Sequence, residues 1–106
     1  MAQLHPEKPT AIFAMNDLLA GGVYEYAAGH GMKIGQDLSV IGFDNRDSSQ
    51  EYRPPLSTVA LPLFEMGRTA AQTLFSMIDS DSKPAPEHII HVPCTFLDRS
   101  SVCAVK

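Results

Sequence analysis

The sequence lacks the features that mark disulfide-rich secreted domains and membrane proteins. It has two cysteines in 106 residues, Cys94 and Cys103, which are too few and too close together for a disulfide framework. No apolar run approaches the roughly 18 residues that a membrane-spanning helix needs, and no basic-then-apolar leader opens the chain. We therefore expect free thiols, no membrane span and a cytoplasmic location.

Positive charge and catalytic motifs are also scarce. Eight Lys and Arg stand against twelve Asp and Glu, a balance that argues against a free-standing basic nucleic-acid binder. The chain has no nucleophile elbow, no glycine-rich phosphate loop and no acidic pair that identifies a general acid and base. The sequence therefore predicts neither an enzyme nor a bound cofactor. Hydrophobic residues make up 44% of the chain, which is enough for a small globular core.

The first pattern predicts a buried strand that leads into a helix. Residues 10–15 form a short apolar run, which favours a strand. Asn16 can accept an amide hydrogen bond as the N-cap, and Asp17 places negative charge at the positive end of the helix dipole. The helix is predicted to end near Ala28. Its apolar face is predicted to comprise Leu19, Val23, Tyr26 and Ala27.

A second apolar run, residues 38–43, is followed directly by Asp44 and completes a strand–helix–strand unit. Such units have parallel strands and are almost always right-handed, and ligands bind beyond the carboxyl ends of the strands. Asn16 and Asp44 both occupy that end of their strands. We therefore expect the two side chains to share one edge of a parallel sheet.

The second half of the chain predicts a third strand, a long helix and two final strands. Residues 56–61 form the strand, and the helix runs from Pro62 to Asp79. The final strands cover 88–92 and 95–97, separated by Pro93. Because the helix has an apolar stripe that must be buried, we expect a homodimer, a domain-swapped oligomer or packing of the helix onto its own sheet. The stripe comprises Met66, Ala70, Leu74 and Met77 or Ile78.

These motifs, in this order, resemble the C-terminal half of the effector-binding region of LacI/GalR-family bacterial transcription regulators. The matching segments are residues 9–13 with Asn16-Asp17, residues 37–45, residues 55–59, Met66-Gly67 and residues 99–101. The resemblance implies an α/β fold, a parallel-sheet fragment of the type I periplasmic-binding-protein-like fold, and mostly its C-terminal lobe. One departure is Gly35, where the family commonly has proline.

The resemblance also implies a division of the chain between two lobes. Residues 9–61 and 88–103 would form the C-terminal effector-binding lobe, and the helix 62–80 would belong to the N-terminal lobe. The chain would cross between lobes near 60–62 and return near 83–88. The helix-turn-helix headpiece and most of the N-terminal lobe would be absent from this chain.

By the same resemblance, the parent protein is a DNA-binding transcription regulator, expected to act as a repressor. Its effector is expected to be a carbohydrate or a nucleoside-like molecule, and DNA would be bound only through the missing headpiece. The alternative is a fragment of a sugar-binding protein of a transport system, which a signal peptide upstream would distinguish from a helix-turn-helix. A third reading is that the chain alone has no function and binds sugars weakly, since a lobe provides only part of an enclosed site.

Asp44 is the principal predicted ligand-binding residue, because a carboxylate accepts two hydrogen bonds from hydroxyl or ring N–H groups. Asn16 adds a donor and an acceptor. The resemblance places Leu63 and Phe64 at the lobe crossover as an apolar face for the effector. Tyr52 is a further candidate, which either closes one side of the crevice or covers the proline turn. The competing readings are a turn-forming carboxylate for Asp44 and a helix cap for Asn16.

The spacing of His88, His91 and Cys94 raises the question of a metal site. In a strand, His88 and His91 would point to opposite faces, and Pro93 interrupts the run before Cys94. We therefore predict no metal centre there.

Overall fold

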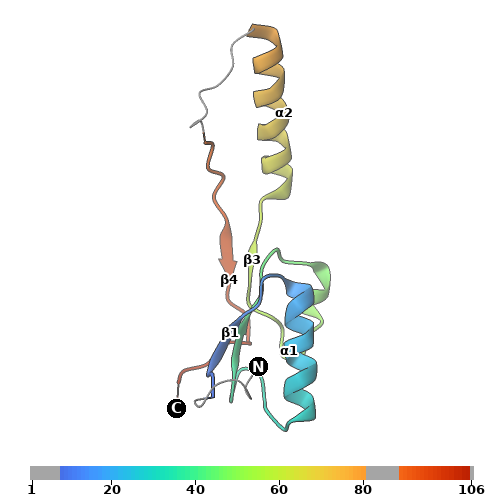
Figure 1. Cartoon of the computed structure of the whole chain (residues 1–106), viewed down its shortest axis with the longest axis vertical. Helices are drawn as coiled ribbons and strands as arrows, with labels where there is room; N and C mark the ends of the chain where they lie inside the picture. The colour runs from blue at the N-terminus through green and yellow to red at the C-terminus, as the bar shows by residue number, and fades with distance from the viewer. Residues whose placement is uncertain (1–7, 81–88, 106) are drawn as a thin grey trace. The chain divides into compact units, whose positions relative to one another are not determined.

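The structure is a computed structural model that describes residues 8–80 and 89–105, and Figure 1 shows the path of the chain. The described parts of Met1–Ala60 and Thr95–Lys106 form a first unit, and those of Leu61–Cys94 form a second. In chain order the elements are β1 (Ala11–Phe13), α1 (Asp17–Gly29), β2 (Ser39–Ile41), the 3-10 helix η2 (Asp47–Gln50), β3 (Thr58–Ala60), α2 (Leu63–Ser80) and β4 (Thr95–Leu97).

The first unit is built on a parallel strand pair joined through α1. β1 and β2 pair in parallel, with Ile12 opposite Val40, and α1 lies beside them (Figure 1). A parallel bridge between Ile41 and Ser57 then connects β2 to the start of β3. The predicted strand–helix–strand unit and the third strand are thus confirmed, in an α/β arrangement.

β4 closes the first unit by pairing antiparallel with β3, with Val59 opposite Phe96. The predicted strand at 95–97 is therefore confirmed. The other predicted strand, 88–92, is wrong over its described part, since residues 89–92 form no strand; His88 lies outside the described residues. Residues 89–92 lie beside a helix, because Ile90 and Val92 line a groove with α2. They therefore have no neighbouring strand with which to pair.

The core of the first unit is small and depends on short side chains. Its largest fully buried apolar residues are Leu56 and Val40. The predicted apolar face of α1 is confirmed in part: Ala27 is buried in the core and Val23 packs against it. Leu19 is 55% exposed and borders an apolar groove of about 480 Å³. The residues that α1 buries fully are small, which allows the helix to approach the sheet closely. The buried apolar cluster is Ala14, Ala20, Ala27, Ile34, Leu38, Val40 and Leu56.

Two glycines are required by backbone geometry or close contact. Gly21 in α1 faces the Tyr52 hydroxyl, which would lie 2.9 Å from an added Cβ. Gly35 has φ +82° and faces the Ser100 carbonyl oxygen. Proline fixes φ near −65°, so this chain could not carry the family's proline at Gly35 without a different turn.

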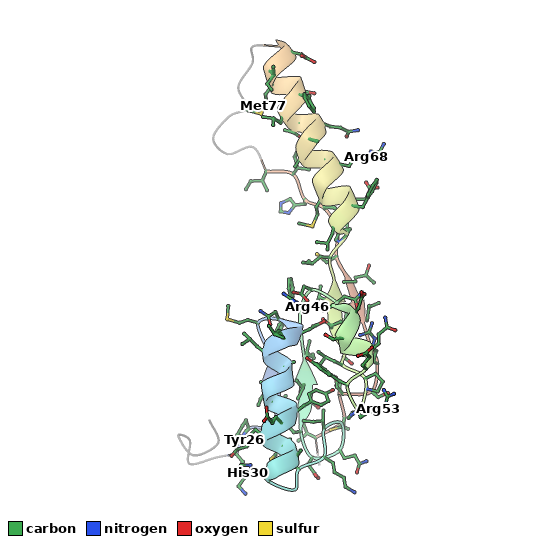
Figure 2. The ribbon with its side chains drawn as sticks, turned by 90° about the vertical axis from the view of Figure 1, so that its right-hand side faces the viewer. Tyr26, His30, Arg46, Arg53, Arg68 and Met77 are labelled. Atoms are coloured by element: carbon green, nitrogen blue, oxygen red, sulfur yellow. The ribbon has the colours of Figure 1, made fainter. Side chains whose placement is uncertain are left out.

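The second unit consists of α2 and the extended residues 89–94. The predicted helix is confirmed, and the Pro62 carbonyl accepts a hydrogen bond from the Met66 N–H at 2.8 Å. The apolar stripe borders a groove of about 410 Å³, yet Leu74 remains 54% exposed. Arg68, labelled in Figure 2, is not among the groove residues and pairs with Glu65 at 3.7 Å. The groove residues are Met66, Thr69, Ala70, Thr73, Leu74, Met77, Ile90 and Val92.

Candidate functional site

Asn16 follows the carboxyl end of β1 and begins α1. Its backbone is extended, and its Oδ1 accepts a hydrogen bond from the Leu19 N–H at 2.8 Å. The predicted N-cap is therefore confirmed. The cap uses only the side-chain oxygen, and the described residues provide no partner for the side-chain NH2. Asn16 thus keeps a hydrogen-bond donor at this edge of the sheet.

Asp17 has a larger role than the predicted helix-dipole partner. Its side chain is fully buried. One carboxylate oxygen accepts from the Thr58 hydroxyl at 2.6 Å, and the other accepts from the Arg46 N–H at 2.7 Å. Its own N–H donates to the Phe43 carbonyl at 3.0 Å. Asp17 therefore joins the start of α1 to the loop after β2 and to β3, in addition to lying in the first turn of the helix as predicted.

Asp44 lies at the carboxyl end of β2, on the same edge of the sheet as Asn16. Its backbone is in the left-handed region, with φ 96°, and Asn45 follows with φ 55°. The Asp44 N–H donates to the Val59 carbonyl at 2.9 Å. Oδ2 lies 3.5 Å from Arg46 Nε. Oδ1 is buried and has no hydrogen-bond partner among the described residues, so this carboxylate keeps an unsatisfied acceptor.

The Asp17 contacts bring the two predicted residues onto one edge. Asn16 precedes Asp17 directly, and Asp17 is bonded to residues on both sides of Asp44, at Phe43 and Arg46. Figure 2 shows Arg46 beside the beginning of α1. The structure therefore places the carboxamide and the carboxylate in neighbouring loops, as the strand topology predicts.

Arg99 supports the loop beside Asp44, a role that the sequence interpretation missed. Its guanidinium donates to the Asn45 Oδ1 at 2.9 Å and to the Ser49 hydroxyl at 2.7 Å. A further bond reaches the Leu56 carbonyl at 2.9 Å. Arg99 thus ties the loop after β2 to η2 and to the entry of β3. The available signal was its place in the 99–101 motif, which gave no indication of its partners.

Ser101, two residues later, is also fully buried. Its hydroxyl donates to the Val40 carbonyl and accepts from the Ser57 N–H at 2.8 Å. Ser101 therefore links β2, at Val40, to Ser57, the residue just before β3.

Tyr52 lies against α1. Its hydroxyl donates to the Asp17 carbonyl at 2.9 Å, and its ring is 5.0 Å from that of Tyr24. The Tyr24 hydroxyl donates to the Pro54 carbonyl at 2.7 Å. Burial raises the pKa of Tyr24 to about 12, and the nearby Tyr52 adds to the rise while a hydrogen bond with Ser101 opposes it. Both tyrosines thus hold the 52–54 turn against the helix.

Leu63 and Phe64 begin α2 in the second unit. Their side chains are 64% and 80% exposed. Their assignment to the ligand site stays a prediction from the resemblance. The histidine and cysteine spacing considered above involves His88, His91 and Cys94. No group of residues that could hold a metal ion occurs in the described part of the chain. Cys94 is exposed, and His88 lies outside the described residues.

A profile of the periplasmic-binding-protein-like domain matches residues 1–102. The chain belongs to the periplasmic-binding-protein-like domain family. The HTH-type transcriptional repressor CytR of Escherichia coli strain K12 is 36% identical over 100 residues, which are 94% of this chain and 29% of that repressor. The resemblance to LacI-family transcription regulators is thus confirmed, and the relatives named here are regulators, not enzymes.

Solved structures agree with this assignment. A LacI-family regulator from Enterococcus faecium with bound ribose superposes with a TM-score of 0.80 at 37% identity, over 99% of this chain and 38% of that one. The Lac repressor dimer bound to operator and an anti-inducer gives 0.81 at 28% identity, over 91% of this chain and 32% of that one. This member of the periplasmic-binding-protein-like family therefore spans about a third of the length of its relatives. In its described residues, no helix is long and apolar enough to cross a membrane.

Proposed function

We propose that this chain forms part of the effector-binding region of a cytoplasmic, sugar-responsive LacI-family repressor. The homology to regulators supports this proposal, and one similar structure was solved with ribose. The effector class is a carbohydrate or a nucleoside-like molecule. DNA is bound through a headpiece outside this chain, in a homodimer; the similar Lac repressor was solved as a dimer bound to operator.

Within that region, the first unit corresponds to the C-terminal lobe and α2 to the N-terminal lobe. The division of the structure between Ala60 and Leu61 supports this assignment, since it falls within the crossover expected at 60–62. The second division lies between Cys94 and Thr95, later in the chain than the return expected at 83–88.

The observation that carries the proposal is Asp44 Oδ1, a buried carboxylate oxygen that has no hydrogen-bond partner among the described residues. A buried acceptor without a partner costs about 1–3 kcal/mol. The Asp44 side chain as a whole is 26% exposed, so a rotation of its carboxylate would bring Oδ1 within reach of a ligand hydroxyl or ring N–H that donates to it. The NH2 of Asn16, which has no partner in the part of the chain that the structure describes, supplies a complementary donor on the same edge. Together they fit a molecule that both donates and accepts hydrogen bonds, such as a sugar.

The mechanism is a shift of population without bond chemistry. A ligand that contacts both lobes favours one arrangement of the lobes over the other by its difference in affinity for the two. In the dimer this alters the relation between the two headpieces. Tyr52 contributes by holding its turn against α1, and Leu63 and Phe64 contribute an apolar face.

A thermal-shift screen of the gene product that carries this sequence tests the proposal, with pentoses, hexoses, nucleosides and purines as ligands. Asp44→Asn is expected to weaken binding of the best ligand about tenfold to a hundredfold, because a charge-assisted hydrogen bond is lost. Asp47→Asn is the matched control, since Asp47 is an exposed carboxylate three residues away in η2. Unchanged affinity in Asp44→Asn, or equal losses in both variants, would refute the assignment.

A further inference from the structure

The loop that carries Asp44 is held in a costly backbone conformation. Asp44 and Asn45 are consecutive left-handed residues, with φ 96° and 55°. Non-glycine residues persist in that region only when their surroundings enforce it. The conformation therefore requires specific contacts on the residues next to Asp44.

Those contacts converge on two buried polar side chains. The Thr58 hydroxyl lies 3.4 Å from the Asn45 N–H, which donates to it, and the Asp17 carboxylate accepts the Arg46 N–H at 2.7 Å. Thr58 and Asp17 are both fully buried. The N–H groups of Asn45 and Arg46, the two residues after Asp44, thus donate to two side chains that are hydrogen-bonded to each other.

The chemistry of the pair fixes its direction. The Thr58 hydroxyl has a single proton, which it donates to Asp17 Oδ1 at 2.6 Å. The lone pairs of the Thr58 oxygen are then directed to donors such as the Asn45 N–H. Asp17 therefore orients Thr58, and Thr58 orients the backbone beside Asp44.

We propose that Asp17, acting through the Thr58 hydroxyl, is a positioning residue that holds Asp44 in its ligand-binding conformation. The proposal rests on the function proposed above, and neither residue needs to contact the ligand. Gly42 belongs to the same device, because an added Cβ there would overlap Asp17 Oδ1. Glycine at 42 thus leaves the space in which the carboxylate sits.

The test compares Thr58→Val with Thr58→Ser in the gene product that carries this sequence. Valine keeps the shape of threonine and removes the hydroxyl, whereas serine restores the hydroxyl. Thr73→Val is the matched control, since the Thr73 hydroxyl donates to the Thr69 carbonyl in α2 at 2.8 Å. The readouts are amide hydrogen exchange of peptides covering 43–50 and the affinity for ribose or for the best ligand of the screen.

We expect Thr58→Val to speed exchange at 45–46 about tenfold and to weaken ligand binding by a similar factor, as the loss of one buried hydrogen bond predicts. Thr58→Ser restores both, and Thr73→Val changes neither. If Thr58→Val fails to fold, Asp17→Asn, which keeps the size of the side chain, is expected to give the same selective increase in exchange.

Two results separate this proposal from the function on which it rests. Normal exchange and normal affinity in Thr58→Val, with weakened binding in Asp44→Asn, would overturn the positioning role alone. Faster exchange at 45–46 without any effect of Asp44→Asn on binding would refute the proposed function and leave Asp17 and Thr58 as the device that holds the loop.

Discussion

Two glycine-to-alanine substitutions are expected to change stability in opposite directions. An alanine Cβ at Gly42 would overlap the Asp17 carboxylate and lie 2.8 Å from Leu56 Cδ2, both fully buried side chains. Neither can move aside into solvent, so Gly42→Ala should lower the free energy of unfolding by about 1–3 kcal/mol. At Gly22, in the middle of α1, an added Cβ meets nothing within 4 Å. Gly22→Ala should therefore raise the free energy of unfolding by about 0.5–1 kcal/mol.

Urea unfolding followed by far-ultraviolet circular dichroism measures the difference. With a slope of about 1–3 kcal/mol per molar urea for a protein of this size, the two midpoints should differ by roughly 0.5–4 M, with the unsubstituted chain between them. A Gly42→Ala variant as stable as the unsubstituted chain would mean that Asp17 does not occupy the space against Gly42. Gly22→Ala is the control: it shows whether a glycine-to-alanine change lowers stability where no clash is expected.

Three further outcomes follow from the same contacts. Gly35→Ala should lower the free energy of unfolding by about 1–2 kcal/mol or more, since a Cβ at φ +82° is strained; an unchanged thermal midpoint would contradict this. Tyr24 has a pKa of about 12 in the folded protein, so as the pH rises the unfolded chain loses this proton first, near pH 10. The free energy of unfolding should therefore fall between pH 10 and 12. Tyr24→Phe should make that fall smaller. The 106-residue chain alone should bind ribose weakly by calorimetry, because part of a site encloses part of a ligand; a dissociation constant near 1 μM, about −8 kcal/mol, would refute this.

The elements that the sequence predicted well depend on neighbours in the chain. The N-cap at Asn16 is decided by the Leu19 N–H three residues away. The span of α2 follows from its own periodicity and from Pro62, which precedes it. The common edge of Asn16 and Asp44 follows from the parallel pairing of β1 with β2, since parallel strands end on the same side of a sheet.

The elements that it missed depend on distant partners. Asp17 is buried because Thr58, 41 residues later, donates to it, and Arg99 reaches back 54 residues to Asn45. No local pattern contains those pairings. The segment 89–92 has strand-like residues but lies beside α2, and a strand exists only where another strand accepts its hydrogen bonds.

The predicted face of α1 was confirmed only in part, for a related reason. Apolar residues at helical spacing identify a face, but they do not identify what covers it. Leu19, Val23 and Tyr26 border an apolar groove of about 480 Å³, while Ala27 of the predicted face and Ala20 beside it lie in the buried cluster. The small side chains of the two alanines allow a close approach, a property that hydrophobic periodicity does not measure.

The polar side chains around Asp44 form hydrogen bonds within the protein, whereas one oxygen of Asp44 forms none among the described residues. Asp17, Asn45 and Arg99 each direct their side chains into bonds that hold the loop. Asp44 occupies the most strained backbone position of the loop, and its Oδ1 bonds to nothing among the described residues. A carboxylate needed only for folding would be expected to satisfy both oxygens, as Asp17 does. The contrast between these two carboxylates is therefore the strongest structural reason to assign ligand binding to Asp44 and support to Asp17.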